Sequence, residues 1–306
     1  MLKRFTFKKI AITTLLLLLA LILYNYPEVI NEEVVVDDCK RINIYLIDEN
    51  DFVGMTEIKT NSNSDELIEE IINSLIIGGN PTNLPEGFKA IIPKGTKLLD
   101  YELKDGLLKI NFSKEFLLVD LENEEKMLEA LVYSLTTIKD VKKIMIFVEG
   151  KHLRELPKTK IKLDLYLDRS IGINKIININ NIANTSMTTV YYLSNTKNSY
   201  YIPISYISND NDDKIEIIIN SLRTNRLNSS NLSSHLNYQV ELIDYEKTNN
   251  EVVLNFNEIL LASVFEGKLK EEIKYAISYS IYDTLGALNV IFQVNNEKID
   301  EFRLEN

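Results

Sequence analysis

The sequence predicts an α+β protein in which an N-terminal transmembrane helix is followed by two tandem copies of a small α/β sandwich module. Three observations predict this fold class. An apolar run follows a basic N-terminus, short matches recur in the same order 144 to 147 residues apart, and each copy alternates β-rich and helical patterns in the order ββαββαβ. That order is typical of a small sheet with helices covering one face.

The N-terminus has the chemistry of a membrane anchor. Four basic residues lie within residues 1–9, and residues 10–26 form a 17-residue apolar segment, which is the lower limit for crossing about 30 Å of hydrocarbon. Small residues suited to cleavage are missing before Pro27, so we expect an uncleaved signal anchor. The positive-inside rule places residues 1–9 in the cytoplasm and the main body outside it. A buried helix of a soluble protein is the alternative, and the lack of a polar face argues against it.

An internal repeat organises the rest of the chain. The matches are Ile72-Asn73-Ser74-Leu75 with Ile219-Asn220-Ser221-Leu222, Tyr45-Leu46 with Tyr192-Leu193, Asn111-Phe112 with Asn255-Phe256, and Tyr133-Ser134 with Tyr279-Ser280. Chance matches would not keep this order and spacing. We therefore predict a cytoplasmic tail and anchor at 1–26, a juxtamembrane linker at 27–39, copy one at 40–172, an Asn-rich linker at 173–185 and copy two at 186–306.

Copy one opens with a predicted hairpin and helix. The stretches 42–47 and 52–58 are β-rich and are separated by four polar residues. A helix follows the capping residues 62–64, and Gly78 ends it. Its apolar positions recur at helical spacing and form one face for packing, and they are Leu67, Ile68, Ile71, Ile72 and Leu75.

The second half of copy one predicts another hairpin, a helix and a strand. Residues 97–103 and 107–112 flank Asp105-Gly106, and Asp-Gly between β-rich runs is a strong hairpin signal. The next helix begins near Glu122, with apolar residues at spacings of three and four. The apolar stretch 143–148 completes the unit as a strand.

Charge and residue types exclude several classes of function. Acidic residues outnumber basic ones by 45 to 34, and only 30 basic residues remain without the four N-terminal cations, so the body should repel nucleic acid and anionic lipid. One cysteine, Cys39, and two histidines effectively exclude structural zinc, and Cys39 lies too far past the apolar segment to resemble a lipid-modified cysteine. Motifs for phosphate, dinucleotide or calcium binding and for a nucleophile elbow are missing. We predict no enzymatic activity, no catalytic residues, no cofactor and no metal.

Some polar and aromatic residues leave alternatives open. The acid pairs Asp48/Glu49 and Asp212/Asp213 fall in predicted turns and caps, where solvated acids are the usual explanation. The two histidines are interpreted as exposed polar residues rather than as ligands. A tyrosine cluster at the start of copy two suits carbohydrate stacking, an interface or half-buried strands, and we favour the strands; it comprises Tyr191, Tyr192, Tyr200, Tyr201 and Tyr206.

An ordered set of motifs in copy one carries a family resemblance. The motifs are Ile44-Tyr45-Leu46, Leu75-Ile76-Ile77-Gly78-Gly79, Ile92-Pro93-Lys94-Gly95-Thr96-Lys97, Ile110-Asn111-Phe112-Ser113 and Leu131-Val132-Tyr133-Ser134. With them copy one resembles the GerMN domain of sporulation and spore germination proteins. Copy two has Leu236 to Val240 in place of the Pro-Lys-Gly-Thr-Lys turn, and so resembles a degenerate second GerMN domain. The resemblance implies tandem domains behind a membrane anchor, with a fold similar to the ring-building motif of envelope assemblies.

The expected function is a non-catalytic docking or assembly element in sporulation or spore germination. The protein is expected to cross the cell membrane once, with both copies outside the cytoplasm. Expected partners are envelope or sporulation assembly proteins, a second copy of the chain and peptidoglycan, and nucleic acid is not expected. The alternative is a protein that binds cell-wall glycan and, behind that, an envelope hydrolase.

Copy one is expected to carry the main partner contact. Glycines and prolines between its first helix and next strand fix the backbone, whereas residues 225–237 contain neither residue type. The candidate partner-binding residues are Gly79, Asn80, Pro81, Pro93, Gly95 and Thr96. The alternative for Pro93 and Gly95 is that they only form a tight turn before the strand.

Overall fold

The computed structural model describes residues 14, 15, 17, 18, 40–60, 64–79, 84–196, 198–209, 213–224, 227 and 231–304. The chain separates into two compact units, Met1–Asp38 and Cys39–Asn306. In the first unit the described residues are helical with exposed side chains. The rest of the predicted anchor and Cys39 lie outside the described residues. Within the described part of the chain, no helix has the length and apolar character that a membrane span requires.

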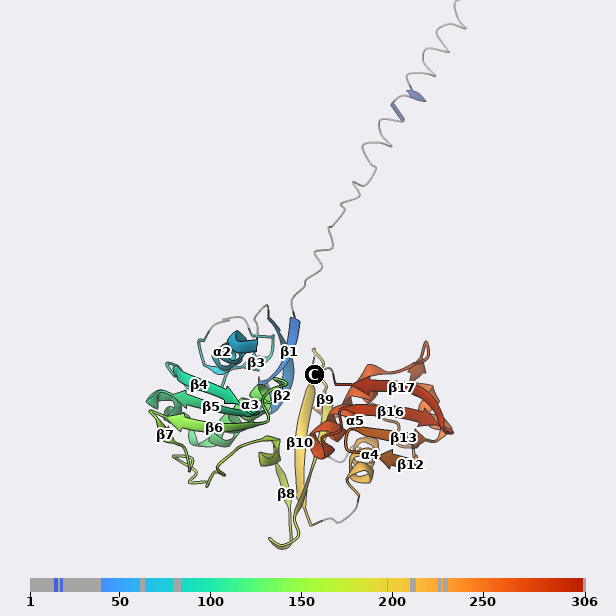
Figure 1. The fold of residues 1–306 in the computed structure, drawn as a ribbon. Helices are drawn as coiled ribbons and strands as arrows, with labels where there is room; N and C mark the ends of the chain where they lie inside the picture. The colour runs from blue at the N-terminus through green and yellow to red at the C-terminus, as the bar shows by residue number, and fades with distance from the viewer. Residues whose placement is uncertain are drawn as a thin grey trace, which may run out of the picture. The chain divides into compact units, whose positions relative to one another are not determined.

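The long elements of copy one follow the predicted order ββαββαβ (Figure 1). They are β1 (Lys40–Asp48), β2 (Val53–Thr60), α2 (Ser64–Leu75), β4 (Leu98–Lys104), β5 (Leu107–Phe112), α3 (Glu124–Leu135) and β6 (Lys143–Val148). Two short strands, β3 (Phe88–Lys89) and β7 (Lys151–His152), and three 3-10 turns, Lys114–Leu118, Leu121–Asn123 and Arg169–Ile171, complete the copy.

Copy two repeats this order with a longer last strand. Its long elements are β9 (Ser186–Ser194), β10 (Tyr201–Ser208), α4 (Lys214–Thr224), β12 (Leu242–Lys247), β13 (Glu251–Phe256), α5 (Glu271–Leu285), β16 (Asn289–Val294) and β17 (Glu297–Arg303). The shorter elements are β11 (Leu232–Ser233), β14 (Val264–Phe265), β15 (Lys268–Leu269) and the 3-10 turn Glu258–Ser263.

The first hairpins of the two copies join one another rather than the other strands of their own copies. They form a shared sheet in the order β11-β9-β10-β2-β1-β3. The remaining long strands form two separate four-stranded sheets, β4-β5-β6-β7 and β12-β13-β16-β17. The sequence predicted one small sheet per copy. The two hairpins share a sheet because β2 and β10 pair with each other through Met55 and Tyr201, which covers an edge of each hairpin.

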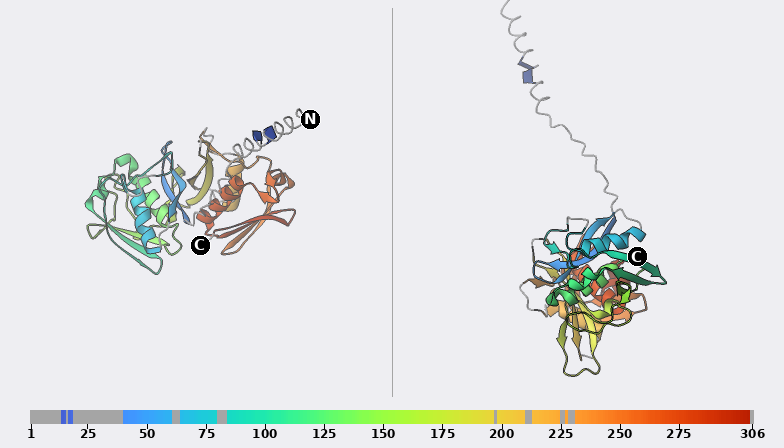
Figure 2. Two further views of the ribbon diagram at one scale, coloured as in Figure 1. Left: turned by 90° about the horizontal axis from the view of Figure 1, so that it is seen from above. Right: turned by 90° about the vertical axis from the view of Figure 1, so that its left-hand side faces the viewer.

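Helices lie between the shared sheet and each outer sheet. Helix α3 packs on β1 and α5 packs on β9, and the outer sheets lie beyond them on either side (Figures 1 and 2). Along β5, Leu108, Ile110 and Phe112 are fully buried while the alternating residues are half-exposed. One face of each outer sheet is therefore covered by helices, as the sequence pattern predicts.

Part of the expected linker is a packed element. Strand β8 (Ile176–Asn178) pairs in parallel with β10. Ile173 is fully buried, and its backbone exchanges hydrogen bonds with Ser205 on β10. The Asn174 side chain accepts a hydrogen bond from the Val53 amide and donates to the carbonyls of Val53 and Pro203, 2.8–2.9 Å away. Residues 173–178 thus join β2 to β10, a role that an Asn-rich composition does not reveal.

Candidate functional site: the interface between the two copies

Two serines give the copies the same local geometry. Ser134 on α3 accepts a hydrogen bond from the Tyr45 amide at 2.8 Å, and Ser280 on α5 accepts one from the Tyr191 amide at 2.9 Å. Tyr45 and Tyr191 are therefore structural equivalents. The sequence match had paired Tyr45 with Tyr192, which is one residue out of register. A slip of one residue in a strand moves a side chain to the opposite face of the sheet.

The two equivalent tyrosines meet at the centre of the interface. Their hydroxyl oxygens are 2.9 Å apart, and both side chains are buried. The Tyr45 hydroxyl also donates to the Met55 sulfur at 3.4 Å, while the Tyr191 hydroxyl donates to Asp283 Oδ2 at 2.5 Å. Strands β1 and β9 thus direct one tyrosine each toward the same point.

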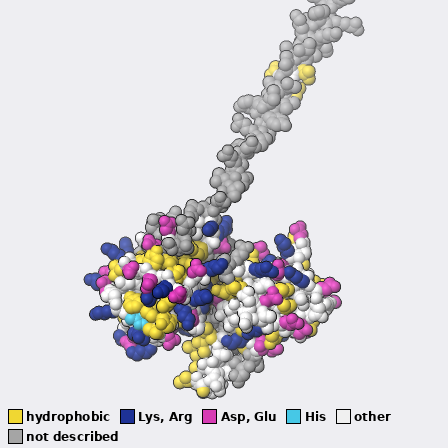
Figure 3. Space-filling view, in the orientation of Figure 1, with side chains coloured by type: hydrophobic (Ala, Val, Ile, Leu, Met, Phe, Trp, Pro, Cys, Tyr) yellow, Lys and Arg dark blue, Asp and Glu magenta, His cyan; other side chains and the backbone are white. Residues whose placement is uncertain are grey.

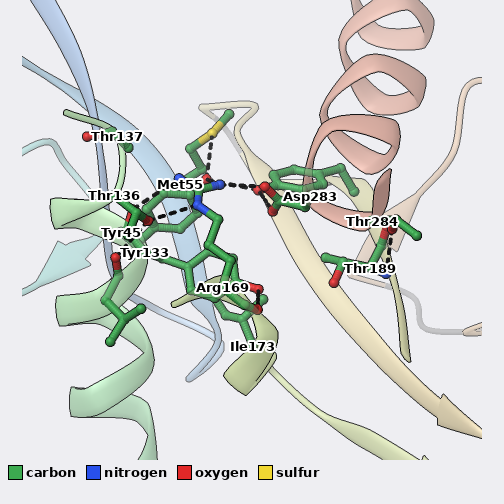
Figure 4. Close-up of polar contacts among 12 residues, drawn as sticks. Tyr45, Met55, Tyr133, Thr136, Thr137, Arg169, Ile173, Thr189, Asp283 and Thr284 are labelled. Atoms are coloured by element: carbon green, nitrogen blue, oxygen red, sulfur yellow. Dashed lines mark hydrogen bonds and ion pairs between the residues drawn. The ribbon is translucent and has the colours of Figure 1, made fainter. Parts of the chain in front are cut away.

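Arg169 joins this point to both helices (Figure 4). Its Nη1 donates to Asp283 Oδ1 on α5 at 2.5 Å. The remaining nitrogens donate to the Tyr133 carbonyl on α3 at 3.1 Å and to Oγ1 of Thr136, the C-cap of that helix, at 2.9 Å. The guanidinium also lies over the rings of three tyrosines, Tyr45, Tyr133 and Tyr282, with its carbon 4.9–5.5 Å from their centroids. We call Tyr45, Tyr133, Arg169, Tyr191 and Asp283 the inter-copy cluster.

Burial and charge set the protonation of this cluster. The Asp283 side chain is fully buried and that of Arg169 is 14% exposed. Burial by itself would lower the pKa of Arg169, but the facing Asp283 carboxylate raises it well above its usual range. Burial raises the pKa of Tyr191, and the Asp283 carboxylate raises it further. Burial also raises the pKa of Tyr45, against the opposing effect of Arg169. The cluster is therefore an ion pair surrounded by neutral tyrosines at physiological pH.

A cleft of about 650 Å³ opens beside the inter-copy cluster, with walls from both copies. Copy one contributes Arg41, Asn43, Lys139, Lys142, Asp168 and Ser170, and copy two contributes Tyr279, Tyr282, Gly286, Leu288 and Leu304. Arg169 and Asp283 reach this cleft, but they already bond to one another and to the helices. The arrangement fixes the relative position of the copies and leaves a groove of mixed polar and apolar lining between them.

The predicted tyrosine cluster belongs to this interface and to the core. Tyr191, Tyr192, Tyr200 and Tyr206 are buried, so their rings are not available to stack on a sugar. The Tyr200 hydroxyl donates to Asp48 Oδ2 in copy one at 2.8 Å, and its ring packs on Phe88 with centroids 4.6 Å apart. The structure thus favours the strand and interface explanations of these tyrosines.

Among the described residues predicted to bind a partner, Gly79 follows α2, and Pro93, Gly95 and Thr96 lie in a turn before β4. A Cβ on Gly79 would lie 2.1 Å from the Asn73 carbonyl oxygen, so backbone contact accounts for this glycine. The Thr96 amide and hydroxyl both donate to the Pro93 carbonyl, and Gly95 has a φ of 86° in the same turn. These contacts support the tight-turn alternative for Pro93 and Gly95.

The structure brings only some of the predicted partner-binding residues to a surface. Pro93 and Thr96 are buried, Gly79 is half-buried and Gly95 is exposed. Asn80 and Pro81 lie outside the described residues. Thr96 also lines a groove of about 520 Å³ between α2 and β4. Their role in partner binding stays a prediction.

The other candidate polar residues have structural partners. Asp48 was expected to be solvated but is buried, and it accepts hydrogen bonds from the Asn50 and Phe52 amides as well as from Tyr200. Asp213 accepts from the Ile215 amide at the start of α4, as a cap does. Asp212 lies outside the described residues. His152 packs against Phe147 with ring centroids 5.4 Å apart. Among the described residues, no group of His, Cys, Asp and Glu side chains is placed to hold a metal ion.

Sequence reasoning missed Arg169 and Asp283, the charged members of the cluster. One signal for Asp283 was available. It lies in the last turn of α5, where the helix dipole disfavours an acid and where no basic residue is present. An acid in that position suggests a cation nearby. Arg169 offers no such signal, because it belongs to none of the repeated motifs.

The outer face of the copy-one sheet differs from that of copy two. Met145 and Phe147 are half-exposed on β6, and Leu165 and Tyr166 are about 40% exposed. In copy two, β16 has Ile291 and Gln293 at the corresponding positions. Apolar side chains gather on the copy-one half of the surface in Figure 3. This asymmetry supplies copy one with an aromatic surface patch.

Comparison with known proteins gives consistent matches. A family model described as "Germane: Sporulation and spore germination" matches residues 43–154 and 189–300. The "Spore germination protein GerM" of Bacillus subtilis (strain 168) is 28% identical over 261 residues, covering 83% of this chain and 71% of that protein.

A solved structure, "Tandem GerMN domains of the sporulation protein GerM from Bacillus subtilis", agrees with a TM-score of 0.77 at 24% identity. The match covers 87% of this chain and 97% of that one, and it shows a common fold. The two family matches together cover more than half of the chain. The chain therefore belongs to the Germane family of sporulation and spore germination proteins.

Proposed function

We propose that this protein is a non-catalytic docking or assembly element in sporulation or spore germination. In the same proposal, the N-terminal segment anchors the protein in the cell membrane and both copies lie outside the cytoplasm. Family membership and the name of the Bacillus subtilis relative support a role in sporulation or spore germination. The basic tail followed by residues 10–26 supports the topology.

The bonding within the interface between the copies is the main observation in favour of a docking role. Its charged and hydroxyl groups already bond to each other, as Arg169 does to Asp283 and Tyr200 does to Asp48. These side chains therefore hold the two copies in one body instead of facing a substrate. A rigid body with free outer faces is suited to positioning partners.

The outer face of the copy-one sheet is our proposed docking surface. Phe147 and Tyr166 are aromatic, Met145 is flexible, and Lys143 lies over the Tyr166 ring at 5.9 Å. Aromatic residues and methionine are enriched in protein interfaces. The positive Lys143 gives this surface a preference for a partner segment with acidic residues, whereas copy two presents Gln293 in place of Phe147.

The test compares matched substitutions on the two outer faces in the producing organism. Met145→Glu with Phe147→Glu alters copy one, and Ile291→Glu with Gln293→Glu makes the same change in copy two. We expect the copy-one variant to fold, reach the envelope and lose both its localised position and spore function. Normal localisation and function of that variant, with loss in the copy-two variant, would assign docking to copy two.

Topology and glycan binding need separate measurements. A reporter fused after Asn306 should be active only outside the cytoplasm, and activity inside it would contradict the anchor. Sedimentation with purified peptidoglycan tests the glycan alternative. Binding that survives the copy-one substitutions would favour that alternative over protein docking.

A further inference from the structure

The two copies meet around an approximate two-fold axis. Strands β1 and β9 are equivalent at an offset of 146 residues, and β2 and β10 at an offset of 148, because the hairpin loop of copy two is two residues longer. Met55 pairs with Tyr201 in antiparallel register, which places Gly54 opposite Ile202, its own equivalent. Tyr45 likewise meets its equivalent Tyr191. Residues facing their own equivalents are the mark of a two-fold interface.

Charge breaks this symmetry at the axis. Asp283 occupies the place that Thr137 holds in copy one, since α3 and α5 are aligned by Ser134 and Ser280. Arg169 lies in the 3-10 turn Arg169–Ile171, which follows the repeated elements of copy one. Copy one therefore supplies the guanidinium and copy two the carboxylate of the same buried ion pair.

We propose that the tandem is a fused pseudo-dimer whose interface accepts one copy of each kind. The surface of copy one around Arg169 is thus a docking surface for copy two, whether copy two is joined to it or supplied by a second chain. If copy one paired with another copy one, two Arg169 guanidiniums would be buried without a carboxylate. If copy two paired with another copy two, two Asp283 carboxylates would be buried without a cation. Both like-with-like arrangements carry a large desolvation penalty.

The interface does not need an intact connection between the copies. The residues that join β2 to β10, such as Asn174, precede residue 180, and Ile182 is 90% exposed. A cut between residues 180 and 184 would leave every contact of the inter-copy cluster in place. Association after such a cut must then come from the interface itself.

The experiment uses the full chain with a protease site inserted at residues 181–183, which is cut after folding. We expect the two fragments to stay together as a 1:1 complex in size-exclusion chromatography and native mass spectrometry. Arg169→Asp should weaken their association on the order of 100-fold or more, because two carboxylates then face each other in a buried site. Asp283→Arg should weaken it similarly by pairing two guanidiniums.

Mixing the two cut single variants tests specificity. The copy-one fragment with Arg169→Asp should pair with the copy-two fragment with Asp283→Arg, which restores opposite charges across the axis. A combined Glu102→Lys and Lys109→Glu change inverts an exposed ion pair of copy one and serves as the control, and it should leave association unchanged.

Three outcomes would overturn the proposal. They are separation of the cut wild-type fragments at micromolar concentration, pairs of identical copies as abundant as mixed pairs, and no recovery on mixing the two variants. Circular dichroism of the cut, unseparated sample establishes that the cut itself has not unfolded the protein. The proposal is independent of the docking function, because association of the copies is measured without any partner protein.

Discussion

Copy one and copy two bury the same framework but differ where the backbone turns and where the copies meet. Both place a phenylalanine at the end of the central outer strand and a serine against the first strand. Copy one contains eight of the ten glycines, whereas copy two has only Gly267 and Gly286. The charges at the interface are also divided, with Arg169 on one copy and Asp283 on the other.

This difference separates the residues that determine the fold of each copy from those that join the two copies. Positions shared by the copies satisfy needs that any such module has, namely an apolar core and a partner for the first strand. Positions that differ carry roles that only one copy performs. Matched substitutions that lower stability equally in the two copies would identify positions that make the fold. Matched substitutions with unequal effects would identify positions with a role in only one copy.

The largest expected effect comes from the shared phenylalanines. Phe112 and Phe256 are fully buried, and replacing either with alanine should lower the free energy of unfolding by about 3–5 kcal/mol. Phe112 stacks on Phe116 with centroids 4.5 Å apart, whereas Leu260 lies at that position in copy two. The loss should therefore be larger in copy one, as measured by urea unfolding. A larger loss for Phe256→Ala would contradict the equivalence of the two cores.

A glycine of copy one gives the next largest effect. Gly79→Ala would place a Cβ 2.1 Å from the Asn73 carbonyl oxygen, so the end of α2 must move, at a cost of about 3 kcal/mol. Thermal unfolding measures this loss. Gly87→Ala is the comparison variant, because its added Cβ meets nothing within 4 Å and its cost of roughly 1–2 kcal/mol comes only from the backbone strain at a φ of 88°. A stable Gly79→Ala variant that no longer binds its partner would instead favour a direct binding role for this residue.

Substitution of the two serines tests whether both copies provide a hydrogen-bond acceptor for the first strand in the same way. Ser134→Ala or Ser280→Ala leaves a buried backbone amide, that of Tyr45 or Tyr191, without its acceptor. An unsatisfied buried donor costs about 1–3 kcal/mol. We expect equal losses in urea unfolding, since the distances differ by only a tenth of an ångström. Unequal losses would show that one copy compensates through another acceptor.

The sequence was informative about everything that repeats locally. Helix spacing, the Asp105-Gly106 turn and the recurring Tyr-Ser pair predict the elements of each copy, because local patterns decide them. The register of the repeat was less certain, since copy two has tyrosine at both 191 and 192. The serine contact and the bounds of the first strands identify Tyr191 as the equivalent of Tyr45.

The interface could not be predicted from the same signals. Pairing of β2 with β10 depends on which strand edges remain free after each copy folds, and no local pattern encodes that. Arg169 and Asp283 are 114 residues apart and occur without a repeated motif. Glycines in copy one suggested a binding loop, but at Gly79 and Gly95 the backbone geometry itself requires glycine.

The smallest expected effect concerns the equivalent tyrosines at alkaline pH. Burial raises the pKa of Tyr45 and of Tyr191 above their value of about 10 in the unfolded chain, and Asp283 adds to the rise for Tyr191. A group whose folded pKa is raised contributes stability that is complete below the unfolded pKa and is lost as pH rises. Ionisation of each tyrosine in the unfolded chain should therefore lower the free energy of unfolding by about 1 kcal/mol between pH 10 and 11.

Urea unfolding at both pH values measures this decline. In Tyr45→Phe and in Tyr191→Phe the decline should be smaller by that amount, whatever each substitution costs at neutral pH. Tyr238→Phe, at a 72% exposed position, is the control and should follow the wild-type curve. Curves for all three variants that run parallel to the wild type would mean that water reaches the tyrosine pair in the folded protein, and the two copies would then be joined less tightly than their hydrogen bonds indicate.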